Sequence, residues 1–203
     1  MSEMSKWVYN AVKFEDLNAS LTQTKMIIKN GRAVGVNKDD TQTILNLYHG
    51  FKMIGERCNE DLFSFSKRVN GIVAKEDALF PGEFRSGDVT VSTAMGTYAP
   101  QLLKESDIKN QFNFLQYEPD SPIKAGLLIF LFMTKNQVFW DGNKRTAIIT
   151  VNRYFRQQKL GTFMIGEGEF NEFNILLGKY YLSNLKKDEE SILLFMESNC
   201  IFG

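Results

Sequence analysis

The segment Asn136–Ile149 reads NQVFWDGNKRTAII, and it carries most of the structural information in this sequence. It lies between two apolar helical patterns, the first of which contains the run AGLLIFLFM at 125–133. The spacing predicts one helix that ends at 134–136 and a second that begins at 143–145. The residues between them therefore form a short turn that leads into the second helix.

This turn has the composition of an anion-binding site. A helix N-terminus offers unpaired N–H groups and a positive dipole end, and Gly142 lets a ligand approach the backbone. Lys144 and Arg145 add positive charge, so together these groups predict a phosphate site. Asp141 is a hard oxygen ligand that suits Mg²⁺ bridging phosphates. The alternative is structural: Asp141 caps the helix, Gly142 serves the turn, and the two cations are solvated.

Composition narrows the class of protein. With 203 residues, 43% of them apolar and 17 of them Phe, the chain is long enough for one domain with a real core. Its 24 basic and 24 acidic residues balance, so no basic surface points to nucleic acid. No apolar run reaches the ~20 residues of a membrane span, and the N-terminus has no apolar targeting segment. Cys58 and Cys200 fit neither a disulfide framework nor a zinc site, which favours a reducing, cytoplasmic location.

Apolar residues at helical spacing recur along most of the chain. One pattern begins with Asp39 or Asp40 as the expected N-cap, a second is expected to stop at Gly71, and a third begins with Ser121 followed by proline. Residues 80–100 differ, because they are rich in Gly, Thr and Val and alternate in DVTVS. They predict an extended loop or small hairpin, which is either a functional flap or a surface cover.

Two segments together resemble the Fic/Doc (Fido) family. QVFWDGNKRTA resembles its signature His-x-Phe-x-Asp/Glu-Gly-Asn-Gly/Lys-Arg at every restricted position except the first, where Gln137 replaces the His. FPGEFRSGDVTVS resembles the family's flap, with Gly82, Arg85 and Val89 in place. The likeness covers about residues 20–203, which leaves 1–19 as an N-terminal extension.

The resemblance implies an all-α, mainly helical bundle with a small β-hairpin flap at 80–100 and an active-site loop at 137–145. Typical members move AMP from ATP to a Ser, Thr or Tyr hydroxyl of a protein, and Doc-type members transfer phosphate. It also implies roles for the loop residues. Asp141 would hold Mg²⁺ together with ATP or another nucleoside triphosphate, and the phosphates would be surrounded by Gly142, Asn143 and Lys144. Arg145 would pair with the distal phosphate, and Phe139 would anchor the loop. The flap would dock a target protein as an added strand through Arg85, Ser86, Gly87, Asp88, Val89, Thr90 and Val91.

Three departures from the family pattern bear on activity. Gln137 has no basicity, whereas the family's His takes the proton from the incoming hydroxyl, and losing such a base costs about 10²–10⁴ in rate. The only His of the chain, His49, falls on another helix. The family's inhibitory helix, Ser/Thr-x-x-x-Glu-Gly/Asn, has its best counterpart at Thr24–Lys29, where Ile28 replaces the Glu. Lys144 and Ile148 are nearer the Doc-like form than the AMP-transferring one.

These features allow three hypotheses. The first is a nucleotide-binding Fic protein with weak or lost transfer activity. The second is an active adenylyltransferase or Doc-like phosphotransferase with another proton route. The third is a non-catalytic interaction module. Their partners are a nucleotide and a target protein on the flap, with no nucleic acid and no membrane, and no feature of the sequence fixes an oligomeric state.

Overall fold

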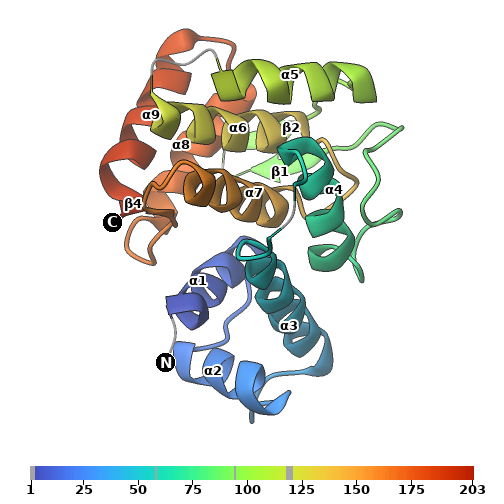
Figure 1. Cartoon of the computed structure of the whole chain (residues 1–203), viewed down its shortest axis with the longest axis vertical. Coiled ribbons are helices and arrows are strands. Elements are labelled where there is room, and N and C mark those ends of the chain that lie inside the picture. Colours follow the sequence, from blue (N-terminus) through green and yellow to red (C-terminus); the bar gives the residue numbers. More distant parts are fainter. Residues whose placement is uncertain (1–2, 58, 94, 118–120) are drawn as a thin grey trace.

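A central buried helix, α7 (Asn143–Gln157), organises the fold (Figure 1). In the computed structural model, which describes residues 3–57, 59–93, 95–117 and 121–203, α6 (Pro122–Asn136) and α4 (Leu62–Val73) pack against it. A Cβ at Gly126 would overlap the ring of Phe155, so α6 and α7 approach each other more closely than larger residues would allow.

The N-terminal quarter of the chain forms one side of the molecule. It consists of α1 (Glu3–Ala11), the 3₁₀ turn η1 (Val12–Glu15), α2 (Leu21–Asn30) and α3 (Lys38–Met53). The side chains of Val8, Ala11, Val12 and Phe14 are buried in the same core as the other helices. Residues 3–19 are therefore an integral layer of the structure, although the sequence suggested an extension.

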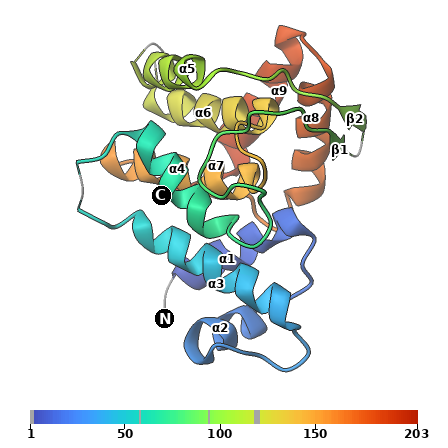
Figure 2. The same cartoon turned by 90° about the vertical axis from the view of Figure 1, so that its right-hand side faces the viewer.

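The C-terminal helices and the hairpin cover the opposite side. Figure 2 shows β1 (Val91–Thr93) and β2 (Gly96–Tyr98) beside α8 (Phe170–Leu182). The two strands are antiparallel, with Val91 opposite Tyr98. The remaining elements are α5 (Glu105–Tyr117), α9 (Lys186–Asn199) and the antiparallel pair β3 (Thr162–Phe163) and β4 (Ile201–Phe202).

The predicted fold class, all-α with a small hairpin, is confirmed, and two boundary predictions are wrong. The N-cap of α3 is Asn37, whose side chain accepts from the Asp40 N–H, so neither Asp39 nor Asp40 caps the helix. Gly71 lies inside α4, which continues to Val73, and it packs against the backbone of Gly82. Among the described residues, no helix is long and apolar enough to cross a membrane.

Candidate active site

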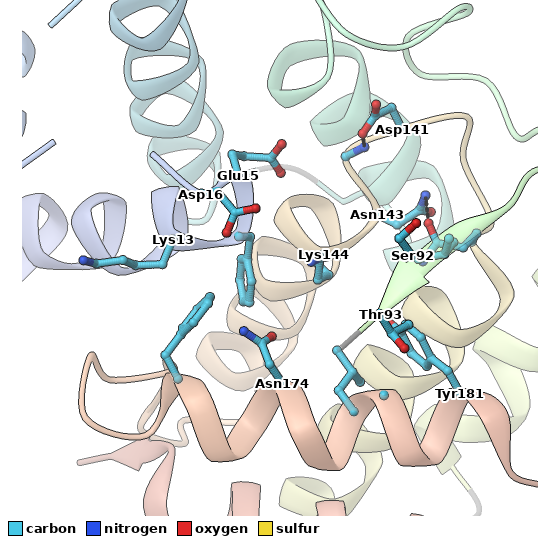
Figure 3. A pocket seen from close by; sticks show the side chains of 17 residues that line it. Lys13, Glu15, Asp16, Ser92, Thr93, Asp141, Asn143, Lys144, Asn174 and Tyr181 are labelled. Carbon is cyan, nitrogen blue, oxygen red and sulfur yellow. Dashed lines mark hydrogen bonds between the residues drawn. The ribbon is translucent and has the colours of Figure 1, made fainter. Parts of the chain in front are cut away.

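A cavity of about 320 Å³ opens at the N-terminus of α7 (Figure 3). Four elements form its walls: α7, η1, β1 and α8. The polar side chains in the wall come from four separate segments of the sequence. Those labelled in Figure 3 are Lys13, Glu15, Asp16, Ser92, Thr93, Asp141, Asn143, Lys144, Asn174 and Tyr181.

The first turn of α7 has the geometry that an anion site requires. Gly142, just before the helix, has φ +68°, and a Cβ there would also crowd Ala74, so only glycine fits without strain. The residues of the turn for which the sequence predicts phosphate binding all line the cavity: Asp141, Gly142, Asn143 and Lys144. The turn therefore presents a helix N-terminus to a polar cavity.

Asn143 braces the loop through its side chain. Its Oδ1 accepts from the Phe139 N–H at 2.8 Å, and its Nδ2 donates to the Phe139 carbonyl at 3.0 Å. Phe139 is fully buried and stacks on Phe84 with 4.7 Å between ring centroids. Phe139 therefore lies in the core beneath the loop, and Asn143 holds the loop in shape through these two hydrogen bonds.

Gln137 is held at both ends of its amide. Its Nε2 donates to the Thr134 carbonyl at 2.6 Å, and its Oε1 accepts from Asn143 Nδ2 at 3.0 Å. Its backbone is left-handed, with φ +45°, and ends α6. Gln137 lines the cavity, yet its amide serves the loop rather than a ligand.

Arg145 lies in a cage of carboxylates instead of facing the cavity. Its side chain is 1% exposed, and its nitrogens approach Glu15 at 2.7 Å, Asp77 at 2.8 Å and Asp141 at 3.3 Å. Nη1 also donates to the Val73 carbonyl. The Glu15 contact lacks the alignment of a hydrogen bond, so it is chiefly electrostatic. In this conformation Arg145 is not available to a distal phosphate, because carboxylates already surround it.

Glu15 is the site residue that the sequence did not reveal. Burial raises the pKa of its carboxyl, against the opposing effect of Arg145. Asp16 follows with φ 54° and also lines the cavity, so η1 turns two acidic residues toward the loop. The contact joins distant parts of the chain, and local periodicity could not predict it. The segment Ala11–Asp16 keeps the Glu of the inhibitory pattern but neither its Ser/Thr nor its Gly/Asn.

Two lysines lie in the cavity wall, Lys144 and Lys13, and Lys13 pairs with Glu167. Lys144 has no such partner among the described residues. Its ammonium lies 5.6 Å from the ring centroid of Phe14, and it forms no ion pair within the described part of the chain. Burial lowers its pKa, while Glu15 opposes that shift. An anion in the cavity would compensate for this desolvated charge.

Asp141 could bind a metal ion only if a bound nucleotide supplied further oxygen ligands. Its half-exposed carboxylate accepts from its neighbour's amide, Gly142 N–H, and from Arg145 Nη2. The described residues include no group of three or more His, Cys, Asp or Glu side chains that could hold a metal ion. Mg²⁺ commonly takes one or two carboxylates and completes its shell with water and phosphate oxygens. Asp141 fits that role when a nucleotide supplies the other ligands.

The flap prediction requires one correction. Arg85 is 4% exposed and donates from its guanidinium to the carbonyls of Gln137, Gly87 and Gln101. It supports the base of the flap from inside, so it does not belong to an exposed docking face. Burial lowers its pKa.

The other flap residues divide between the surface and the cavity. Gly87 packs against the indole of Trp140, while Ser86, Asp88 and Thr90 are exposed and Val89 is half-buried. Val91 begins β1 and lines the cavity together with Ser92 and Thr93. The flap strand therefore forms one wall of the site.

The remaining sequence candidates lie outside the cavity. His49 is exposed on α3, and Thr24–Lys29 lies within α2, which packs against α1 and α3. Ile28 is therefore not the residue that faces the loop. Cys200 is buried as a free thiol, and Cys58 lies outside the described residues.

Comparison with known proteins agrees with this geometry. Residues 60–155, which include α4, the flap and the whole active-site loop, match the Fic/DOC family model. This part of the chain belongs to the Fic/DOC family. The match ends within α7, and the described fold places the N-terminal layer and α8 around this family core.

Solved structures share the fold of this Fic/DOC protein at low identity. A Fic-domain signaling protein from Bacteroides thetaiotaomicron aligns with TM-score 0.76 and 19% identity over 96% of this chain and 80% of its own. A Fic-1 fragment from C. elegans aligns with TM-score 0.75 and 18% identity over 98% and 64%. A Fic family protein from Desulfovibrio desulfuricans aligns with TM-score 0.70 and 12% identity over 96% and 61%. The chain thus spans under two thirds of the latter two, and no curated protein matches it significantly.

Proposed function

We propose that this Fic/DOC protein binds a nucleoside triphosphate, with ATP and Mg²⁺ as the reference ligands, and that its group-transfer activity is impaired. The reaction class is AMP transfer to a Ser, Thr or Tyr hydroxyl of a protein. The observation that carries the proposal is the state of Gln137, whose amide is hydrogen-bonded at both ends within the loop.

The missing step is a proton transfer. In AMP transfer the hydroxyl oxygen bonds to the α-phosphorus, pyrophosphate leaves, and the hydroxyl proton passes to a base. An imidazole accepts that proton near neutral pH, whereas an amide does not. Each polar end of the Gln137 amide already forms one hydrogen bond within the loop, which fixes its orientation and leaves one N–H and one lone pair for a hydroxyl.

The residues that would bind the phosphates are present, in contrast to the proton acceptor. Gly142, Asn143 and Lys144 line the cavity at the start of α7, and Lys144 provides an unpaired positive charge there. Asp141 is the residue that would hold Mg²⁺ beside the phosphates. Val91, Ser92 and Thr93 form the wall along which a target segment would bind.

Glu15 opposes binding of the distal phosphate. Its carboxylate contacts the guanidinium that would otherwise pair with that phosphate, and like charges repel in a partly buried site. Nucleotide entry therefore requires η1 to shift or Glu15 to be protonated. Arg145 becomes available only when this contact opens.

Site-specific fluorescence tests the binding half of the proposal. The chain has two tryptophans, and Trp140 adjoins Asp141, so Trp7→Phe leaves Trp140 as the sole tryptophan reporter of the loop. We expect a saturable change in its emission with ATP and Mg²⁺, weakened at least tenfold by Lys144→Ala. An unchanged emission at millimolar ATP would contradict the proposal.

Residual transfer is the second candidate, and one observation favours it. Glu15 is a carboxylate in the cavity wall whose pKa burial raises, so it is a better proton acceptor than an ordinary Glu. Labelling of lysate proteins by ATP carrying an α or a γ label separates AMP transfer from phosphate transfer. If wild-type labelling is strong and disappears in Glu15→Gln, the second candidate replaces the first.

A further inference from the structure

Two further cavities lie at the other end of α7, away from the candidate active site. They have volumes of about 390 and 510 Å³ and share a wall made of Trp7 and the segment Leu160–Thr162. The 390 Å³ cavity, here called the Trp7 cavity, is bounded by α1 and by the C-terminal ends of α3 and α7. The length of α7, about 22 Å at 1.5 Å per residue, separates it from the candidate active site.

Three positive side chains line the Trp7 cavity: Lys52, Arg156 and Lys159. No acidic residue lines it within the described part of the chain, and none of the three forms an ion pair there. The whole chain has no net charge, so this imbalance is a local feature. Three exposed cations that line one cavity without a counter-charge attract an anion.

The helix ends do not account for these cations. Basic residues often lie at a helix C-terminus because they bond its free carbonyls. At the end of α7, backbone N–H groups of Gln158, Lys159 and Leu160 already donate to the carbonyls of Tyr154, Arg156 and Phe155. After α3, Arg153 donates to the carbonyls of Ile54 and Glu56. The ammonium of Lys52 lies 5.6 Å from the centroid of the Tyr48 ring, whereas Arg156 and Lys159 are left to face solvent or a ligand.

Lys159 occupies a backbone position that favours glycine. Its φ is 57°, at the left-handed residue that terminates α7, where a side chain raises the energy of the native state. A lysine at this position places an ammonium at the cavity, although glycine would make the turn more stable. Residues held in such conformations concentrate at functional sites.

Aromatic side chains provide the apolar part of the cavity. Trp7 and Phe51 both line it, with 6.0 Å between their ring centroids, and Met4 and Ile54 complete the surface. An indole stacks on flat heterocycles, while a guanidinium and two ammonium groups suit a phosphate dianion better than a carboxylate.

We propose that the Trp7 cavity is a second ligand site, distinct from the active site, for an aromatic or heterocyclic ring that carries a phosphate group. The ring packs against Trp7, and the phosphate binds Arg156, Lys159 and Lys52. The inference does not depend on the proposed nucleotide-transfer function, because it uses none of the loop residues.

The test uses Trp7 as a reporter in the full chain. Trp140→Phe leaves Trp7 as the only tryptophan, and its emission is titrated with AMP, adenosine and inorganic phosphate. We expect saturable quenching by AMP at submillimolar concentration, with adenosine and phosphate each at least tenfold weaker. No saturable change with AMP would overturn the proposal, and equal binding of phosphate alone would overturn the ring-binding part.

Lys159→Gly separates a ligand site from a merely structural cluster. It relieves the left-handed strain, so we expect Tm to rise by about 2 °C while AMP affinity falls at least tenfold. Unchanged affinity in this variant would contradict the role of Lys159. Lys144→Ala, in the active site, is the matched control, and its loss of the Trp7 signal would assign the binding to the active site instead.

Discussion

The carboxylate of Glu15 lies 2.7 Å from Nε of Arg145, which joins the N-terminal layer to the family loop. Asp77 and Asp141 contact the same guanidinium, so three acids surround one buried cation. This arrangement stabilises the loop without a ligand and keeps Arg145 away from the cavity. Entry of a triphosphate must therefore compete with a contact inside the protein.

Removing the Glu15 charge should strengthen nucleotide binding. One unit charge a few Å from a phosphate is worth on the order of 1–4 kcal/mol, so Glu15→Gln is expected to tighten ATP binding about tenfold. Trp140 emission in the Trp7→Phe background measures the affinity. Glu190→Gln, at an exposed carboxylate that pairs with Lys186 outside the cavity, is the control and should change little. Equal affinities for the wild type and Glu15→Gln would show that this contact does not restrict the site.

The same residue predicts how stability depends on pH. Burial raises the pKa of Glu15 in the folded state, so the native protein holds this proton more tightly than the unfolded chain. The free energy of unfolding should then fall as pH rises from about 4.5 through the raised pKa. Glu15→Gln should flatten this part of the curve, which denaturant titrations between pH 4 and 7 would measure. A curve of unchanged slope in the variant would contradict the assignment.

Lys144 should lower the stability of the protein and strengthen its binding of ATP. Burial lowers its pKa, so its charged form is penalised in the folded state at neutral pH. Lys144→Met is expected to raise Tm by a few degrees and to weaken ATP binding at least tenfold. Lys135, whose pKa burial also lowers but which donates to the Ser183 carbonyl outside the cavity, is the control. Its Met variant should leave ATP affinity intact.

Asn70, which lies on α4, should affect both the free energy of unfolding and the conformation of the active-site loop. Its buried amide donates to the Asp141 carbonyl and Thr146 Oγ1 and accepts from the Gly82 N–H. Asn70→Ala leaves these groups unpaired, which costs about 2–3 kcal/mol and should also weaken ATP binding.

Asn152→Ala is the matched control for that prediction. Asn152 is equally internal and makes three hydrogen bonds, to Ile148 and to both backbone groups of Phe163, far from the loop. It should lose similar stability, measured by denaturant unfolding, without losing the Trp140 response to ATP. An equal loss of response in both variants would mean that only global stability matters.

Local sequence predicted the elements that depend on local chemistry. The turn before Asn143, the end of α6 and the hairpin at 80–100 follow from glycine positions, apolar spacing and β-branched residues, which act over a few residues. Contacts between distant segments could not be predicted in this way. The cage around Arg145 and the burial of Arg85 arise only when η1, the flap and the loop meet in space.

We propose that this protein retains the phosphate-binding half of the site and lacks the proton-accepting half. Transfer from α-labelled and γ-labelled ATP to proteins of a lysate, compared between the wild type, Gln137→His and Gln137→Asn, tests this proposal most directly. We predict that only Gln137→His raises labelling, by about 10²-fold or more, because only imidazole supplies the base. Strong wild-type labelling that Gln137→His leaves unchanged would contradict the account.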